Sequence, residues 1–264
     1  MLGVIVKESL RGIKLDEGRE AGPPEVRIGG QTEDHSNTPL VHDGIGYIIR
    51  GEKSHVETGY VVFLDALGMK GIWQHCQMDR VVGMWTNAVG AYMDSLQAHQ
   101  SGLNAIYQFR VLSDTIIIII PTTLNDFSIV QVFDFLLDPF ITSIKNHMLF
   151  RGTISYGLYF ISPRLILGPA LDDAAIYNNR LNWIGIALTP DLASRILPMR
   201  IDIPNTVEYN TPLKKLQNYR SMVLDWPRYD KGGTCYGILQ NKYGSSPDKE
   251  KYENTFKFYE ARRM

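Results

Sequence analysis

Apolar residues along the chain occur in short runs, separated by glycine, proline and polar residues, which predicts alternating strands and helices. Residues 61–64 are apolar and lie between Gly59 and Gly68, the pattern of a central strand buried on both faces. Residues 107–112 and 115–121, with isoleucine at every position from 116 to 120, predict two strands that are joined near Ser113 and Asp114.

Elsewhere, apolar residues that recur at spacings of three and four predict helices, and extended apolar runs predict strands. The expected helices cover 71–100, a segment from Asn125 onward, 168–180, 190–196 and 249–263, and the expected strands cover part of 41–55, 148–160, 183–188 and 222–226. Pro139 should kink or interrupt its helix. This order predicts an α+β fold of the ferredoxin-like type, with a mostly antiparallel sheet and helices packed on one face.

The composition divides the chain into three parts. Residues 15–37 are rich in Glu, Asp, Gly and Pro and predict a flexible arm within an N-terminal extension, 1–55. The main domain is expected over 56–200, followed by a C-terminal extension over 201–264, where the signals weaken.

Charge and cysteine content exclude several classes of function. The 264 residues carry a formal net charge of -1, which does not favour a nucleic-acid-binding protein or a protein of anionic membrane surfaces. The two cysteines, Cys76 and Cys235, have no zinc-site spacing and argue for a reducing compartment without disulfides. No segment reaches the roughly 18 apolar residues of a membrane span. We therefore expect a cytoplasmic protein.

Asp65 and Asp114 are the candidate chemical groups, because each lies at the end of a strongly apolar strand. If these strands are neighbours, the two carboxylates converge and need a divalent cation to neutralise them. The alternatives are that Asp65 caps a helix and that Asp114 is only a turn residue. The main-chain amides of residues 66–69 could bind a triphosphate, or form an ordinary strand-to-helix turn. The candidate phosphate partners, which could equally be surface charges, are Lys70, Arg110 and Arg151.

Three motifs together resemble a known family. They are FLDALG at 63–68, LSDT at 112–115 and RGTISYG at 151–157, in that order. They are similar to motifs of the class III nucleotidyl cyclase catalytic domain, and most of all to its bacterial pyrimidine-nucleotide branch, the Pycsar cyclases of antiphage defence. The resemblance covers residues 60–197 and implies that 56–200 is the catalytic domain of a head-to-tail homodimer.

The resemblance implies catalysis by two Mg²⁺ or Mn²⁺ ions. Asp65 and Asp114 would bind the ions, with the Ala66 carbonyl as a further ligand, so that the ribose 3′-oxygen attacks the α-phosphorus and diphosphate leaves. The residues that would lie against the nucleotide are Phe63, Leu67, Gly68 and Arg151.

One departure from the family concerns the residues that contact the ribose and the transition state. Purine cyclases of this class carry an asparagine and, four residues on, an arginine, where this chain has Asp172 and Ile176. The departure fits a pyrimidine-specific site, for which the candidate substitutes are Arg151, Asn178, Asn179 and Arg180. The resemblance favours UTP over CTP.

The leading hypothesis is therefore a uridylate cyclase that makes 3′,5′-cyclic UMP during phage infection and so activates a separate effector protein. A cytidylate cyclase making cyclic CMP is the alternative within the same class. An inactive cyclase-like module that senses a nucleotide is the alternative of another class.

Overall fold

Strand β2 (Glu52–Ala66) forms the centre of the fold in a computed structural model of the chain. The structure describes residues 45–49, 52–69, 72, 76–99, 107–122, 126–162, 165–215 and 217–263. The predicted arm over 15–37 and Lys70 lie outside these residues. Residues 60–64 are almost completely inaccessible, as expected for a strand covered on both faces.

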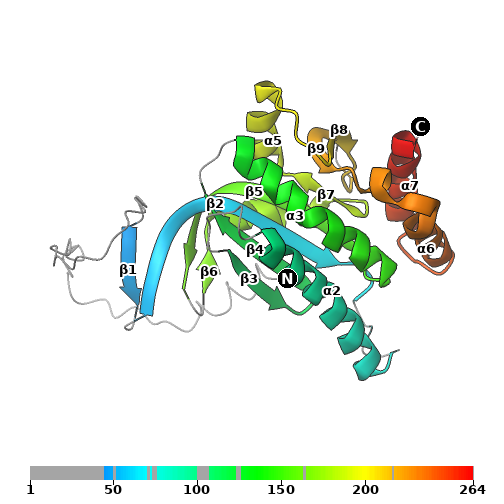
Figure 1. Cartoon of the computed structure of the whole chain (residues 1–264), viewed down its shortest axis with the longest axis horizontal. Helices are drawn as coiled ribbons and strands as arrows, with labels where there is room; N and C mark the ends of the chain where they lie inside the picture. The colour runs from blue at the N-terminus through cyan, green and yellow to red at the C-terminus, as the bar shows by residue number, and fades with distance from the viewer. Residues whose placement is uncertain are drawn as a thin grey trace. The chain divides into compact units, whose positions relative to one another are not determined.

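The described strands join in one sheet with the order β3-β4-β2-β5-β7-β9-β8, while β1 pairs with β2 and β6 with β5 (Figure 1). The other strands are β1 (Ile45–Ile49), β3 (Gln108–Leu112), β4 (Thr115–Pro121), β5 (Phe150–Ile161), β6 (Ile166–Leu167), β7 (Gly185–Leu188), β8 (Thr206–Thr211) and β9 (Tyr219–Leu224). The pairing of β5 with β7 is parallel and the remaining described pairings are antiparallel.

The helices alternate with these strands along the chain. They are α2 (Met78–His99), α3 (Asp126–Lys145), α4 (Pro169–Arg180), α5 (Pro190–Ile196), α6 (Thr234–Tyr243) and α7 (Lys249–Arg263), with short 3-10 turns at Leu197–Met199, Trp226–Tyr229 and Lys231–Gly233. The order β2-α2-β3-β4-α3-β5 together with the sheet order β3-β4-β2-β5 is the ferredoxin-like βαββαβ arrangement. The predicted α+β fold class is confirmed. None of the described helices is long and apolar enough to cross a membrane.

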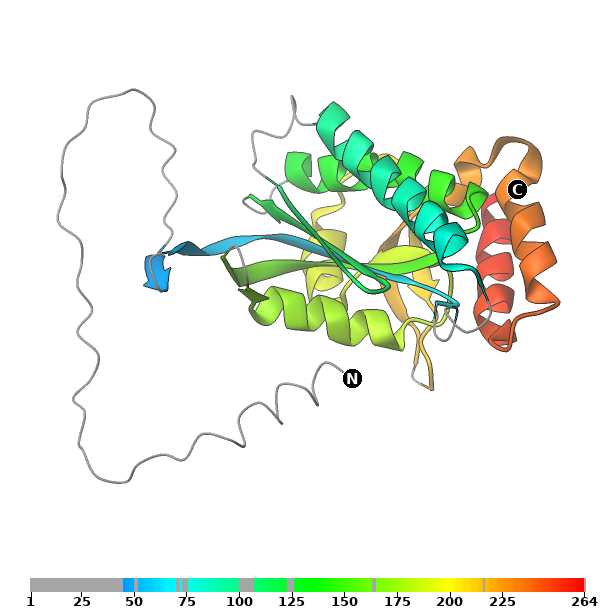
Figure 2. The ribbon, with the colours of Figure 1, turned by 90° about the horizontal axis from the view of Figure 1, so that it is seen from below.

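The prediction that helices cover one face of the sheet is wrong. Helices α2 and α3 cover one face, and α4 lies against the other (Figure 2). The alternation of β2 explains this arrangement, because Val62 and Leu64 belong to the large core under α2 and α3, whereas Val61 and Phe63 pack with α4. The face under α4 is the face on which the side chain of Asp65 emerges.

Helix α3 runs through Pro139 without interruption. Proline has no N–H, so the carbonyl of Phe135, four residues earlier, loses its helical hydrogen-bond partner. The hydroxyl of Ser95 on α2 donates to this carbonyl at 2.8 Å. A neighbouring helix thus replaces the missing bond, and the expected break does not occur.

The sheet continues beyond residue 200. Strands β8 and β9 extend it, and α6 and α7 follow, so residues 206–263 of the predicted C-terminal extension are largely folded. The predicted strand near 222–226 and the predicted helix over 249–263 are present as β9 and α7, whereas β8 and α6 were not predicted.

Candidate active site

Asp65 lies at the end of β2, where three segments of the chain meet. Its Cα partners are Thr115 on β4 and Arg151 on β5. Because side chains alternate along a strand, the Asp65 carboxylate is on the same face as Phe63. The sequence therefore places a carboxylate at the end of a buried strand, on the face of the sheet against which α4 packs.

Asp114 lies beside it, in the two-residue turn that joins β3 to β4. Ser113 in this turn has a left-handed backbone (φ 56°), and the N–H of Ala66 donates to the Asp114 carbonyl at 2.8 Å. The Asp114 charge also contributes to raising the pKa of Asp65. The structure brings the two predicted aspartates together at one end of the sheet, which we call the Asp65 end.

Asp65 has a cationic partner in this structure. Nε and Nη2 of Arg151 donate to Oδ2 of Asp65 at 2.9 and 2.6 Å, and Nη1 donates weakly to the Leu181 carbonyl at 3.4 Å. Burial raises the pKa of Asp65 above its ordinary value, while the Arg151 guanidinium acts in the opposite direction. The helix-capping alternative for Asp65 is not realised, since its carboxylate binds Arg151 and α2 begins only at Met78.

The turn after Asp65 offers fewer main-chain donors than the sequence suggested. The N–H of Ala66 is bound to Asp114, and the N–H of Leu67 donates to the Leu149 carbonyl at 2.7 Å. Gly68 has a positive φ of 79°, a conformation that glycine adopts without strain. Among the described residues, the N–H groups of Gly68 and Met69 have no acceptor. Two amides of this turn are therefore left for an anion.

Helix α4 forms the wall of the site on this face. The hydroxyls of Thr153 and Ser155 on β5 donate to the carbonyls of Ala174 and Ala170 on α4, at 2.7 and 2.6 Å. These alanines allow the helix to approach the sheet closely. Phe63 is only 7% exposed and belongs to the small apolar cluster that α4 covers. The helix is thus held in register with the strand that carries Arg151.

The α4 residues that stand at, or could replace, the missing purine-cyclase contacts have different environments. Ile176, at the position of the purine-cyclase arginine, is 49% exposed. Asn178 is almost completely buried, and both polar atoms of its side chain lack a hydrogen-bond partner. Asn179 and Arg180 are exposed, and the Arg180 guanidinium lies over the ring of Tyr177, 5.1 Å from its centroid. Arg110 lies on β3 and donates to the carbonyl of Phe109 and the side chain of Gln108.

Lys214 is a charged residue at this end of the sheet that the sequence analysis missed. It lies between β8 and β9, and its Nζ donates to the Asn179 carbonyl at 2.8 Å. Burial, followed by the positive charges of Arg151 and Lys251, lowers the pKa of Lys214 to about 8. The Lys214–Lys215 pair was the available signal, but nothing in the sequence placed this segment beside Asp65.

The donor set fits Mg²⁺ or Mn²⁺. Both ions favour carboxylate and carbonyl oxygens, and Mg²⁺ is commonly held by one or two carboxylates together with substrate phosphates. Asp65 and Asp114 supply two carboxylates, and Oδ1 of Asp65 is not used by Arg151. Among the described residues there is no group of three or more His, Cys, Asp or Glu side chains that could hold an ion without substrate.

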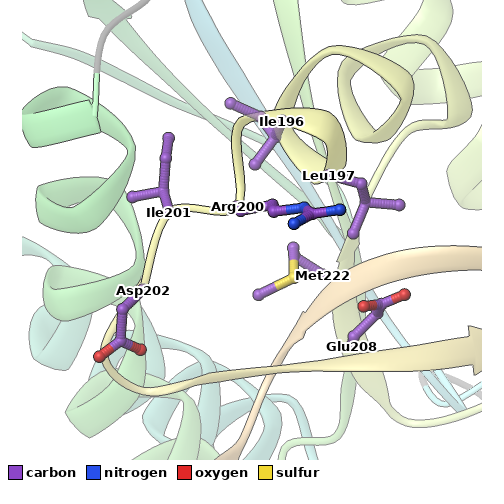
Figure 3. A pocket seen from close by; sticks show the side chains of 7 residues that line it. All are labelled: Ile196, Leu197, Arg200, Ile201, Asp202, Glu208 and Met222. Atoms are coloured by element: carbon purple, nitrogen blue, oxygen red, sulfur yellow. The ribbon is translucent and has the colours of Figure 1, made fainter.

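A separate pocket of about 320 Å³ contains none of the predicted site residues (Figure 3). It lies between the end of α5 and strands β8 and β9, and it is lined by Ile196, Leu197, Arg200, Ile201, Asp202, Glu208 and Met222. Glu208 is already paired with Arg220. This pocket is therefore not the meeting point of the two aspartates.

No protein-family model and no curated protein matches the chain. Among solved structures, the catalytic core of a rhodopsin-guanylyl cyclase with converted specificity, in complex with ATPαS, is 12% identical with a TM-score of 0.47, covering 65% of this chain and 97% of that one. The adenylyl cyclase CyaB from P. aeruginosa is 10% identical with a TM-score of 0.47, covering 64% and 93%. The monomeric guanylyl cyclase domain of the RhoGC fusion protein from the aquatic fungus Blastocladiella emersonii is 14% identical with a TM-score of 0.46, covering 66% and 96%. Similarity at this level assigns neither a substrate nor a reaction to this chain.

Proposed function

We propose that this protein is a pyrimidine nucleotide cyclase that converts UTP to 3′,5′-cyclic UMP and diphosphate. The observation that carries the proposal is the meeting of Asp65 and Asp114 at one end of the sheet, where the end of β2 and the turn between β3 and β4 are neighbours in space but distant in sequence. The motif resemblance of residues 60–197 supplies the reaction.

In this proposal the two carboxylates bind a pair of Mg²⁺ or Mn²⁺ ions together with the Ala66 carbonyl. Such ions promote ionisation of the ribose 3′-hydroxyl and neutralise the triphosphate. Arg151 opposes the rise in the pKa of Asp65 that burial causes, and it would also bind a phosphate oxygen, because a guanidinium can bind two oxyanions at once. Lys214 adds a second cation near the same phosphates.

The turn after β2 would bind the nucleotide through its backbone. The N–H groups of Gly68 and Met69, which have no acceptor among the described residues, would bind an oxyanion, while Leu67 and Phe63 would supply apolar contact. The order of events is attack of the 3′-oxygen on the α-phosphorus, formation of the new P–O bond and departure of diphosphate with its negative charge. Arg151 and Lys214 then hold the diphosphate as it forms.

The choice of base and the biological setting come from the resemblance. The resemblance alone makes UTP the preferred substrate and CTP the alternative. Ile176, in place of a purine-cyclase arginine, fits a pyrimidine rather than a purine substrate. The enzyme would act in the cytoplasm as a head-to-tail homodimer over 56–200, and cyclic UMP would activate a separate effector in antiphage defence. The parts over 1–55 and 201–264 would be extensions of this catalytic domain.

One observation favours a second candidate, a catalytically inactive module that senses a nucleotide. Arg151 already neutralises Oδ2 of Asp65, so this carboxylate has a partner without any metal. In such a module the Asp65–Arg151 pair would be structural, and the adjacent amides and Lys214 would bind the phosphates alone.

Incubation of the purified full chain with each of the four ribonucleoside triphosphates and Mn²⁺ tests the proposal. Cyclic UMP formed from UTP is the expected result, and cyclic CMP alone would assign the chain as a cytidylate cyclase. No cyclic product from any nucleotide, with retained nucleotide binding, would favour the sensing module.

A further inference from the structure

The C-terminal helices are attached to the Asp65 end of the sheet by buried polar contacts. Thr255 on α7 is completely buried, and its hydroxyl accepts the N–H of Ile184 at 2.8 Å. Asn254 donates from Nδ2 to the carbonyl of Asn182 at 2.9 Å. Ile184 and Asn182 lie in the segment between α4 and β7, the segment whose Leu181 carbonyl receives Arg151. Helix α7 is thus bonded to the segment that precedes β7 and follows the Arg151 contact at Leu181.

Aromatic packing and an ion pair fix the rest of α7. The ring of Phe258 lies 5.0 Å from that of Trp183, and Arg262 donates from Nε and Nη2 to both oxygens of the buried Asp225, at 3.0 and 2.7 Å. Two parallel bonds between a guanidinium and a carboxylate also define an orientation. Contacts along its length thus pack α7 against the rest of the fold.

A cavity of about 300 Å³ lies at the beginning of α7. It is lined by Asn182, Pro247, Asp248, Lys249, Glu250 and Lys251. Because α7 begins at Lys249, the positive end of its helix dipole lies at this cavity. A volume of this size is sufficient for a diphosphate group.

The charges around the cavity are connected to the active site. Lys251 pairs with Asp248, and this bond, followed by the charges of Lys214 and Arg151, lowers the pKa of Asp248. The charges of Arg151 and Lys251 in turn contribute, after burial, to lowering the pKa of Lys214. The cavity is also close to the candidate active site along the chain, because Asn182, which lines it, follows Leu181, whose carbonyl accepts a hydrogen bond from Arg151.

Asn182 provides an independent indication that the cavity accepts a polar group. Asn182 is 4% exposed and lines the cavity. Its backbone is bound on both sides, since its N–H donates to the Pro212 carbonyl at 3.0 Å and its carbonyl accepts from Asn254. Its side-chain amide, however, bonds to no other described residue. The amide is therefore free to hydrogen-bond a group that is bound in the cavity.

We propose that this cavity is a subsite for a diphosphate group, with Lys251, the first turn of α7 and the Asn182 amide as its ligands. The inference rests on the proposed function, because the diphosphate would be either the β- and γ-phosphates of the bound nucleotide or the diphosphate released from it. The C-terminal extension is then a contributor to substrate binding and product release.

Calorimetric titration of the full chain with inorganic diphosphate tests the subsite without any turnover. Lys251→Gln should weaken diphosphate binding by about tenfold, the typical effect of losing one charge-assisted hydrogen bond. Lys257→Gln, on an exposed position of the same helix, is the matched control and should bind as the wild type does. No binding by the wild type, or equal binding by Lys251→Gln, would overturn the proposal.

A second variant keeps the test decisive if Lys251→Gln folds poorly. Asn182→Asp preserves the backbone contacts and the side-chain volume but places a negative charge in the cavity, so diphosphate binding should weaken more than it does in Lys251→Gln. Unaltered binding by Asn182→Asp would contradict the subsite.

Kinetic measurements distinguish the source of the ligand and the failure of each proposal. If the cavity holds the nucleotide's own phosphates, Lys251→Gln raises KM for UTP; if it holds the product, the variant raises only the inhibition constant of diphosphate. Diphosphate binding that depends on Lys251, in a chain without cyclase activity, would contradict the cyclase and support the subsite. Cyclase activity in the wild type, with the binding and inhibition constants of diphosphate unchanged in Lys251→Gln, would support the cyclase and contradict the subsite.

Discussion

Arg151 donates from Nε and Nη2 to a single oxygen of Asp65, Oδ2, at 2.9 and 2.6 Å, although 86 residues separate the two in sequence. The bond fixes the direction of the carboxylate and opposes the rise in its pKa that burial causes. The second oxygen, Oδ1, accepts no hydrogen bond from any of the described residues. The pKa of Asp65 therefore remains above its ordinary value, with one oxygen bound to Arg151 and the other open to a cation among the described residues.

Asp114→Ala should abolish turnover while the protein remains folded. Asp114 lies in a turn and is partly exposed, so its loss removes a metal ligand but little packing. We expect kcat/KM to fall by at least about a thousandfold, because charge stabilisation by a bound ion is worth several kcal/mol. Asp94→Ala, an exposed acid on α2, is the control for general charge effects. Activity close to that of the wild type in Asp114→Ala would exclude this carboxylate as a ligand.

Asp65→Ala should lose both activity and stability. Its removal leaves the buried Arg151 guanidinium without its carboxylate, and an unpaired buried group costs about 1–3 kcal/mol. Urea unfolding of Asp65→Ala and of the double variant Asp65→Ala, Arg151→Met measures the effect. The double variant should recover part of the lost stability, because both partners are then absent. Equal stability of the wild type and Asp65→Ala would show that the pair contributes nothing.

The pH dependence of kcat/KM should report the charge on Lys214. Burial and the nearby Arg151 and Lys251 lower its pKa to about 8, so Lys214 loses its proton as the pH rises through that value. With Mg²⁺, kcat/KM for UTP should decrease above pH 8, since this profile reflects ionisation of the free enzyme. Lys214→Arg stays protonated, and its profile should remain flat over the same range. An identical decrease in both proteins would assign the ionisation to another group.

The same shift has an opposite consequence for stability. Since folding lowers the pKa of Lys214 from 10.5 to about 8, the unfolded chain binds more protons than the folded chain between these values. The contribution of Lys214 to the free energy of unfolding should therefore increase as the pH rises from 8 to 10.5. Chemical unfolding of Lys214→Met, compared with the wild type at both pH values, measures the difference; a decrease with pH would contradict the sign.

Ser95→Ala should destabilise the protein by about 0.5–1.5 kcal/mol, the usual net value of one hydrogen bond. The Ser95 hydroxyl donates to the Phe135 carbonyl that Pro139 leaves without its helical partner. A double-mutant cycle with Pro139→Ala, followed by urea unfolding, isolates this role. In the Pro139→Ala background the cost of Ser95→Ala should be smaller. An equal cost in both backgrounds would show that the proline and the serine are independent.

Much of the fold could be predicted because its central strands are uninterrupted apolar runs. Residues 61–64 and 116–120 have no helical periodicity, and two strands joined at Ser113–Asp114 followed directly. Strand β8 was missed because TVEYNT has few apolar residues, and α6 was missed because TCYGILQNKY contains a glycine and has no clear apolar stripe.

The candidate site was predicted less completely than the fold. The approach of Asp65 to Asp114 could be predicted because it required only one assumption, that their strands are neighbours in the sheet. The Asp65–Arg151 pair, the position of Lys214 and the docking of α7 depend on tertiary contacts between distant segments. Side-chain type and spacing carry no information on such contacts, so only the structure could supply them.

The most direct test of the account is a quantitative product analysis of UTP incubated with Mn²⁺ and the purified full chain. The account predicts one diphosphate released for each 3′,5′-cyclic UMP formed, with both products absent in Asp65→Asn and Asp114→Asn. Cyclic UMP formed at an undiminished rate by either variant, or no cyclic product from any nucleotide with the wild type, would contradict the claim that these two aspartates form a cyclase site.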